Sequence, residues 1–158
     1  MPRKITKDLS RQIPPDRIYD SVLVQRLINK VMRNGKKQQA ERLVYKAMEM
    51  AAKRLKEKDP LEVLLTALDN IKPEMETRSK RVGGANYQVP LEVKPQRQAH
   101  LTLMWFIQAV RQRKGMASDE KICLEIIDAF NQTGVAFKHK EDVQKMAEAN
   151  RAWAHLNR

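Results

Sequence analysis

The sequence predicts a mainly α-helical protein, a single domain of about six helices from which one two-stranded β-hairpin protrudes. The chain has 158 residues, which fits one domain with a sizeable core. Apolar residues recur at helical spacing in six stretches, whereas one stretch alternates apolar and polar residues beside a pair of glycines. The sequence contains no internal repeat, low-complexity tract or linker that would divide this domain.

Residues 1–17 are expected to form a basic, extended arm, so that the helical domain spans residues 18–158. The arm contains Pro14-Pro15 and shows no apolar periodicity, and both features disfavour a helix. Two acids accompany five cations in this segment, namely Arg3, Lys4, Lys7, Arg11 and Arg17.

Three amphipathic helices are expected after the arm. Apolar stripes indicate helices over residues 23–32 and 40–55, with Gly35 as a stop between them. The pair Asp59-Pro60 is typical of a helix start, because aspartate accepts hydrogen bonds at the N-cap and proline fits the first helical position. This third helix is expected to end at Pro73, since the residue before a proline disfavours helical geometry.

The hairpin is expected at about residues 77–93. Its first strand runs to Val82 and its second from about Tyr87 to Val93, and Gly83-Gly84 can take the positive φ values of a tight turn. Pro90 has no N–H to donate, so its strand keeps a free edge. Because two strands alone are marginally stable, the hairpin should pack on helices or bind a partner.

The cations of the hairpin are Arg78, Lys80 and Arg81, and no acid lies beside them. Side chains alternate along a strand, so Arg78 and Lys80 point to one face and Arg81 to the other. Charge on both faces disfavours a hairpin lying flat on a core. Tyr87 is the aromatic residue of this segment, and it could either stack on a base or pack against a helix.

Three further helices are expected after the hairpin. The segment from Pro95 to Val110 is apolar nearly all round, which is typical of a buried central helix, and it ends in the basic stretch Arg111–Gly115. The next helix begins at Ser118 and closes at Gly134, and the last begins at about His139.

The charge of the chain indicates a protein that binds a polyanion. Lysine and arginine number 31 against 19 acids, and the net charge is +12. A surface that is basic merely for solubility is the plainer alternative. The hairpin favours RNA, because a narrow basic ribbon can follow a groove or junction. DNA stays open, since the helices around Gly35 superficially resemble a helix-turn-helix.

No cofactor, metal site or catalytic centre is expected, so the chain is not expected to be an enzyme. His100, His139 and His155 lie far apart, and Cys123 alone cannot complete a zinc site. Gly83-Gly84 matches neither a dinucleotide-binding nor a Walker A pattern. No apolar run is long enough to span a membrane, no secretion signal is present, and a single cysteine indicates a reducing compartment.

Two motifs resemble the small-subunit ribosomal protein seven family in its bacterial form: KRVGGANYQVPLEV in the hairpin and MAEANRAWAH near the C-terminus. The stretches NGKKQQAERLVYKAM, DPLEVLLTALDNIKP and MASDEKICLEIIDAF follow that family's order and spacing, so the resemblance covers nearly the whole chain.

The resemblance implies six helices with a hairpin arm and a structural role in the small ribosomal subunit. It implies primary binding to the 3′ major domain of 16S-type rRNA, nucleation of head assembly, and a position near the exit-site tRNA and the mRNA path. The implied partners include ribosomal protein eleven and other head proteins. The location would be the cytoplasmic ribosome, with an organellar ribosome left open. Binding to the protein's own operon mRNA also stays open.

The resemblance assigns RNA contacts to five regions: the arm, the loop after the first helix, the hairpin, the end of the fourth helix and the C-terminal motif. The residues are Arg3, Lys4, Lys36, Lys37, Arg78, Lys80, Arg81, Gly83, Gly84, Arg111, Arg113, Lys114, Asn150 and Arg151. Two departures concern the C-terminus. Trp153 replaces the usual phenylalanine, and Leu156-Asn157-Arg158 stands where an aromatic residue and arginine often follow the histidine.

Overall fold

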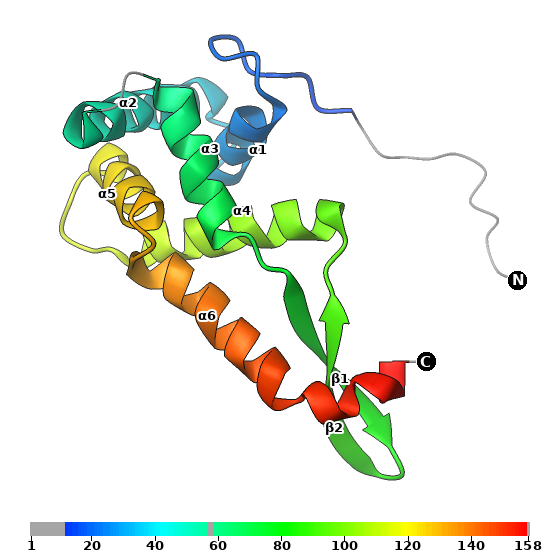
Figure 1. Ribbon diagram of the computed structural model, residues 1–158. Helices are drawn as coiled ribbons and strands as arrows, with labels where there is room; N and C mark the ends of the chain where they lie inside the picture. The colour runs from blue at the N-terminus through cyan, green and yellow to red at the C-terminus, as the bar shows by residue number, and fades with distance from the viewer. Residues whose placement is uncertain (1–11, 57–58, 158) are drawn as a thin grey trace, which may run out of the picture.

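The computed structural model describes residues 12–56 and 59–157, and it confirms the predicted mainly helical class. Within these ranges the chain forms six α-helices, one antiparallel two-stranded sheet and a C-terminal 3₁₀ helix (Figure 1). In chain order the elements are α1 (Val22–Val31), α2 (Lys37–Leu55), α3 (Pro60–Ile71), β1 (Met75–Val82), β2 (Ala85–Glu92), α4 (Pro95–Gln112), α5 (Ser118–Phe130), α6 (Gly134–Ala149) and η1 (Arg151–Asn157).

The helices pack around α4, which is the buried central helix that its composition predicts. This helix contacts α1, α3, α5 and α6, and Phe106 at its middle is fully buried. Apolar side chains from four other helices complete the core at zero exposure, among them Leu27, Met48, Leu64 and Ile126. Burial of such side chains is the main source of stability of the helical body.

Local sequence signals predicted one helix boundary correctly and another wrongly. Asp59 caps α3 as predicted, because its carboxylate accepts a hydrogen bond of 2.8 Å from the Leu61 N–H. The boundary between the last two helices was predicted wrongly: α5 ends at Phe130, and Gly134 opens α6 instead of closing α5. The helix starts early because Ala136, which is 1% exposed, already packs its first turn against the core.

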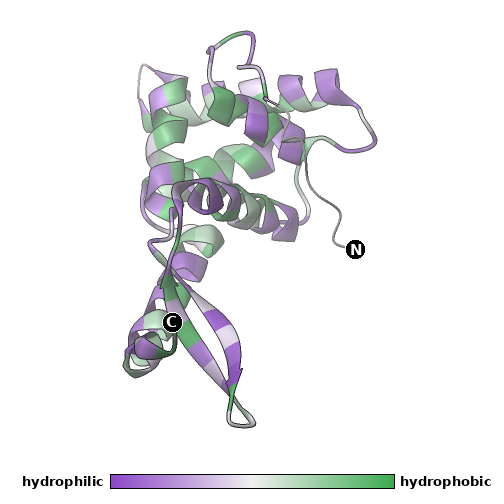
Figure 2. Cartoon of the chain, turned by 90° about the vertical axis from the view of Figure 1, so that its right-hand side faces the viewer, coloured by the Kyte–Doolittle hydropathy of each residue, from purple (hydrophilic) through white to green (hydrophobic). Residues whose placement is uncertain are grey.

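The hairpin projects from the helical body, with α6 and η1 alongside it (Figures 1 and 2). Its strands pair from Met75↔Glu92 to Val82↔Ala85, so the ladder reaches the turn itself and begins two residues before the predicted start. Gly83 and Gly84 have φ values of 58° and 89°, which are those of a type I′ turn. This turn matches the twist of the strands, and it therefore permits pairing directly beside it.

The described part of the predicted arm is anchored to the helical body at its inner end. Asp16 is 3% exposed, and its carboxylate accepts hydrogen bonds from the N–H groups of Ile18, Tyr19 and Ser21 and from the hydroxyl of Tyr45 in α2. Burial raises the pKa of Asp16, but these hydrogen bonds outweigh it, so its pKa lies below the ordinary value. Arg3 and Lys4 lie outside the described residues, and the arm they belong to stays a prediction.

Candidate nucleic-acid interface

A basic hollow of about 420 Å³ lies between the α1–α2 loop and the C-terminal end of α4. Its cationic lining residues are Arg33 and Lys36 from the loop, Arg111 from α4 and Lys121 from α5. Apolar residues such as Val110 also line it, and none of the described residues that line it carries a carboxylate. Two of the predicted basic clusters, distant in sequence, therefore contribute to one surface.

The local backbone explains why the loop presents its cations to the hollow. Asn34 and Gly35 both have positive φ values, of 52° and 72°, so the chain reverses sharply after α1. The Lys36 N–H donates to the Arg33 carbonyl at 3.0 Å and closes this turn. On the opposite side, the Arg111 guanidinium donates to the carbonyl of Lys30 at 3.5 Å, which brings the end of α4 beside the end of α1.

This arrangement suits the binding of phosphate groups. Lysine and arginine side chains neutralise phosphates and release condensed counterions, and here four of them line one hollow with no acid among its described lining residues. Lys37, the first residue of α2, is also exposed, but its Nζ lies 3.9 Å from Oε1 of Glu41, so part of its charge is already balanced. The hollow is accordingly best matched to a folded polyanion whose phosphates approach from several directions.

Arg113, which is predicted to contact RNA, forms ion pairs with two carboxylates of the protein itself. Its Nη2 lies 2.7 Å from Oε2 of Glu125, which is fully buried, and it also pairs with Asp128. Burial lowers the pKa of Arg113, but the hydrogen bonds that its guanidinium donates to both carboxylates outweigh this effect and raise the pKa. The guanidinium thus neutralises an internal acid pair, while Arg111 and Lys114 on either side of it remain exposed. Its geometry favours a structural role.

The hairpin presents two of its three cations openly. Arg78 and Arg81 are exposed, and no ion pair joins either one to a carboxylate of the described residues. Lys80 differs, because its ammonium donates to the backbone carbonyl of Leu156 at 2.6 Å. The hairpin turn formed by Gly83 and Gly84 is as predicted.

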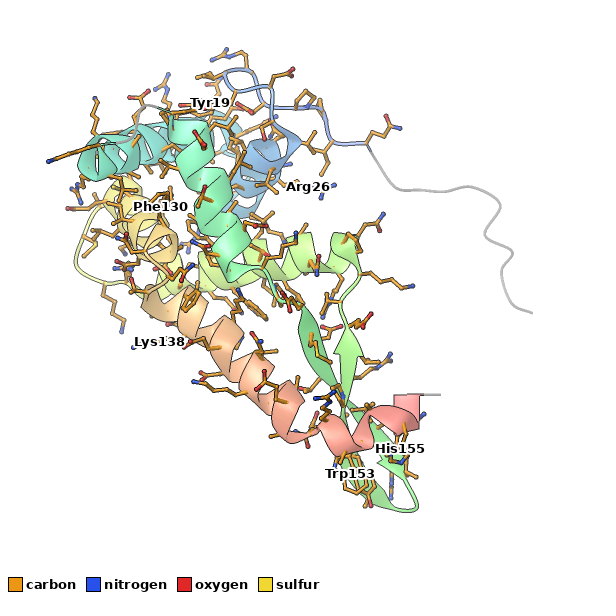
Figure 3. All side chains as sticks on the ribbon, viewed as in Figure 1. Tyr19, Arg26, Phe130, Lys138, Trp153 and His155 are labelled. Atoms are coloured by element: carbon orange, nitrogen blue, oxygen red, sulfur yellow. The ribbon has the colours of Figure 1, made fainter. Side chains whose placement is uncertain are left out.

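The C-terminal segment lies against one face of the hairpin. The ring centroids of Tyr87 and Trp153 are 4.6 Å apart and the ring planes meet at 48°, so Tyr87 packs on η1. Figure 3 shows Trp153 on η1 beside the hairpin. Tyr87 is thus packed against a helix, as one of its two alternatives predicts. Asn150 caps α6, since its amide donates to the Met146 carbonyl at 2.8 Å, and Arg151 is exposed at the start of η1.

Residues 12–56 and 59–157 contain no cluster of three His, Cys, Asp or Glu side chains that could hold a metal ion. Within the same ranges, no helix is both long enough and apolar enough to cross a membrane.

Comparison with known proteins identifies the family. The sequence profile described as ribosomal protein S7p/S5e matches residues 2–151. The chain belongs to this family. Small ribosomal subunit protein uS7 of Dictyoglomus turgidum is 54% identical over 145 residues, covering 92% of each chain. The uS7 proteins of Thermosipho africanus and Chloroflexus aggregans are 54% and 52% identical, and they cover 92% and 100% of this chain and 94% and 99% of their own lengths.

Membership of the S7p/S5e family confirms the resemblance found in the sequence and the predicted role as a protein of the small ribosomal subunit. The chain is a structural, non-enzymatic constituent of the small ribosomal subunit that binds rRNA, and it is located in the ribosome of the cytoplasm. The basic hollow and the exposed hairpin cations are the parts of the described structure suited to that contact.

Two cations that line the hollow, Arg33 and Lys121, and the exposed Trp153 were not identified from the sequence as candidate site residues. Arg33 directly precedes the Asn-Gly reversal, and its position beside a turn was a usable signal. Lys121 reaches the hollow only because α5 packs beside α4, which no local pattern shows. Trp153 was noted as a departure from the family pattern but not as part of a surface, although it is 39% exposed.

Proposed function

We propose that this ribosomal protein is a primary binder of the 3′ major domain of small-subunit rRNA and nucleates assembly of the head. The observation that carries the proposal is the acid-free basic hollow, where Arg33, Lys36, Arg111 and Lys121 converge. A binder that precedes other proteins needs a preformed surface, and this hollow is fixed by helix ends and a closed turn. The family resemblance supports the choice of domain.

We also propose that the hollow, the hairpin and the N-terminal arm each contact a different part of the RNA. The hollow holds a helical junction through its phosphates, and the hairpin extends along the RNA with Arg78 and Arg81. Residues 1–17 form a basic arm that follows the RNA, and residues 18–158 form the folded domain. The position is near the exit-site tRNA and the mRNA path, with ribosomal protein eleven and later head proteins as neighbours.

A binding assay with three RNA fragments tests the choice of domain. The protein is titrated into the 3′ major domain, into another rRNA domain of similar size and into duplex DNA, at matched salt. We expect clear preference for the 3′ major domain, and log affinity should fall linearly with log salt, by about 0.7 to 0.9 per phosphate contact. Equal affinity for all three fragments contradicts the proposal, and preference for duplex DNA would make this a DNA-binding surface.

The contribution of the hollow is tested with the double variant K36A/R111A. It should weaken binding to the 3′ major domain and reduce the salt slope by about one to two. The double variant R42A/K53A removes the same charge from exposed positions of α2 that do not line the hollow. An equal effect of both variants would mean that net charge, not the hollow, accounts for binding. Head assembly is tested by adding the later head proteins to rRNA with and without this protein.

A further inference from the structure

Three aromatic rings form a row on the C-terminal face of the hairpin. Trp153 contacts both of the others, since its ring centroid lies 4.6 Å from that of Tyr87 and 6.3 Å from that of His155. Figure 3 shows Trp153 and His155 on η1 beside the hairpin. The three residues come from β2 and η1, so they lie together only when η1 is packed against the hairpin.

The row is held in place by polar contacts around it. The ammonium of Lys80, which pairs with Tyr87 across the ladder, donates to the carbonyl of Leu156. Nδ1 of His155 lies 2.8 Å from the carbonyl of Ala152, and because a carbonyl only accepts, this nitrogen carries the proton. The rings are therefore ordered before any ligand arrives.

Trp153 is far more exposed than packing alone requires. The other tryptophan, Trp105, lies in the core and is 5% exposed, whereas Trp153 lies in η1 beside the hairpin and is 39% exposed. A ring that served only to fasten η1 to the hairpin would gain more by complete burial, since burial of apolar area is what stabilises such a contact. Part of the indole surface is thus open to a ligand.

The surroundings of the row favour a nucleic acid over a protein as that ligand. Residues 77–91 and 149–158 contain no aspartate or glutamate, and they include the exposed Arg78, Arg81 and Arg151. Exposed aromatic rings beside cations without acids are the arrangement that binds single-stranded nucleic acid, in which bases stack on the rings and cations meet the phosphates. Such stacking needs an unpaired base, because a base inside a duplex keeps both faces covered.

We propose that Trp153, flanked by Tyr87 and His155, is a stacking site for an unpaired RNA base. This site is separate from the basic hollow, which meets phosphates of folded RNA. The proposal rests on the proposed RNA-binding function and adds a second, single-stranded class of ligand to it. Arg78 and Arg81 supply phosphate contacts on either face of the hairpin beside the site.

The test titrates the full-length protein with a single-stranded oligouridylate and follows tryptophan fluorescence. Because Trp105 is buried, a change on binding reports Trp153. We expect saturable quenching, and protection of the exposed indole from iodide, with the single strand but not with duplex RNA of equal length. If the fluorescence stays unchanged at saturating oligouridylate, the proposal is wrong, and this result needs no variant.

Variants and a fragment control separate this site from the hollow. W153A should bind oligouridylate about five- to a hundredfold more weakly, as expected when a stacking ring is lost, whereas W153F should retain most of the affinity. Unchanged affinity of W153A contradicts the proposal. K36A/R111A should lose affinity for the 3′ major domain while still showing the quenching. If other head proteins protect Trp153 from iodide in the absence of RNA, the ring contacts protein and the proposal is wrong.

Discussion

A guanidinium nitrogen of Arg113 lies 2.7 Å from a carboxylate oxygen of Glu125, a side chain of α5 that is fully buried. The second oxygen of Glu125 accepts a hydrogen bond of 3.4 Å from the Ala136 N–H at the start of α6. One buried carboxylate thus connects the chain after α4 to α5 and α6. Arg113 thus has a role in the fold, although Arg111, two positions before it, is exposed.

Removal of Arg113 should therefore destabilise the protein. The variant R113A leaves the buried Glu125 carboxylate without its cation, which should lower the free energy of unfolding by about 3 kcal/mol. Urea denaturation measures this loss. R111A is the matched control, since its side chain is exposed, and it should change stability little but weaken RNA binding. The opposite pattern, a stable R113A with weakened RNA binding, would restore Arg113 to the interface.

The exposed hairpin cations should act on affinity without acting on stability. The double variant R78A/R81A removes two charges that no described acid balances, so the slope of log affinity for rRNA against log salt should fall by about one to two. Helical circular dichroism should stay unchanged. R42A/K53A on α2 again provides the control of equal charge, and a slope that both pairs leave unaltered would place the hairpin away from the phosphates.

Acid should weaken the anchor at Asp16. Its folded pKa lies below the ordinary value of 3.8, so the carboxylate stabilises the fold above that value, and the contribution is lost as pH falls through the folded pKa. D16N should cost about 2 kcal/mol near neutral pH, because charged hydrogen bonds are lost. The gap between D16N and the unaltered protein, measured by urea denaturation, should shrink towards pH 3. A gap independent of pH would contradict this, and exposed Asp20 is the control.

The same anchor should respond to alkali through Tyr45. Burial, followed by the charge of Asp16, raises the pKa of Tyr45 to about 12. Its folded pKa exceeds the ordinary value of 10, so this contribution is complete below pH 10 and is lost as pH rises towards 12. In Y45F that loss should be missing, and ultraviolet titration of the phenol would measure the pKa directly.

The Gly83-Gly84 turn should accept asparagine at Gly83 but should be destabilised by alanine at either glycine. Both glycines have positive φ, so alanine at Gly83 or Gly84 should cost about 1 kcal/mol each and fray the ladder from its tip. G83N should be nearly neutral, because Asn-Gly is a preferred type I′ pair. Open space surrounds both positions, so no steric contact complicates the comparison. Amide exchange of β1 and β2 measures the effect, and equal protection in G83A and G83N would contradict it.

The parts of the structure that could be predicted from the sequence are those with local causes. The Asp59 cap and the Gly83-Gly84 turn depend on residues adjacent in the chain, so both were correct. The hollow could not be predicted, because it joins the ends of α1 and α4 through a contact between residues 81 positions apart. The inward turn of Arg113 depends on the burial of Glu125, which is decided by how three helices pack.

The attachment of η1 to the hairpin also sets an order of events during synthesis. The strands are made before α6 and η1, and a two-stranded ribbon on its own is marginally stable. Its neighbours from those helices, and the link from Lys80 to Leu156, become available only when the last part of the chain has been made. The hairpin is thus completed last, because η1 follows α6, the final helix of the body, in the chain.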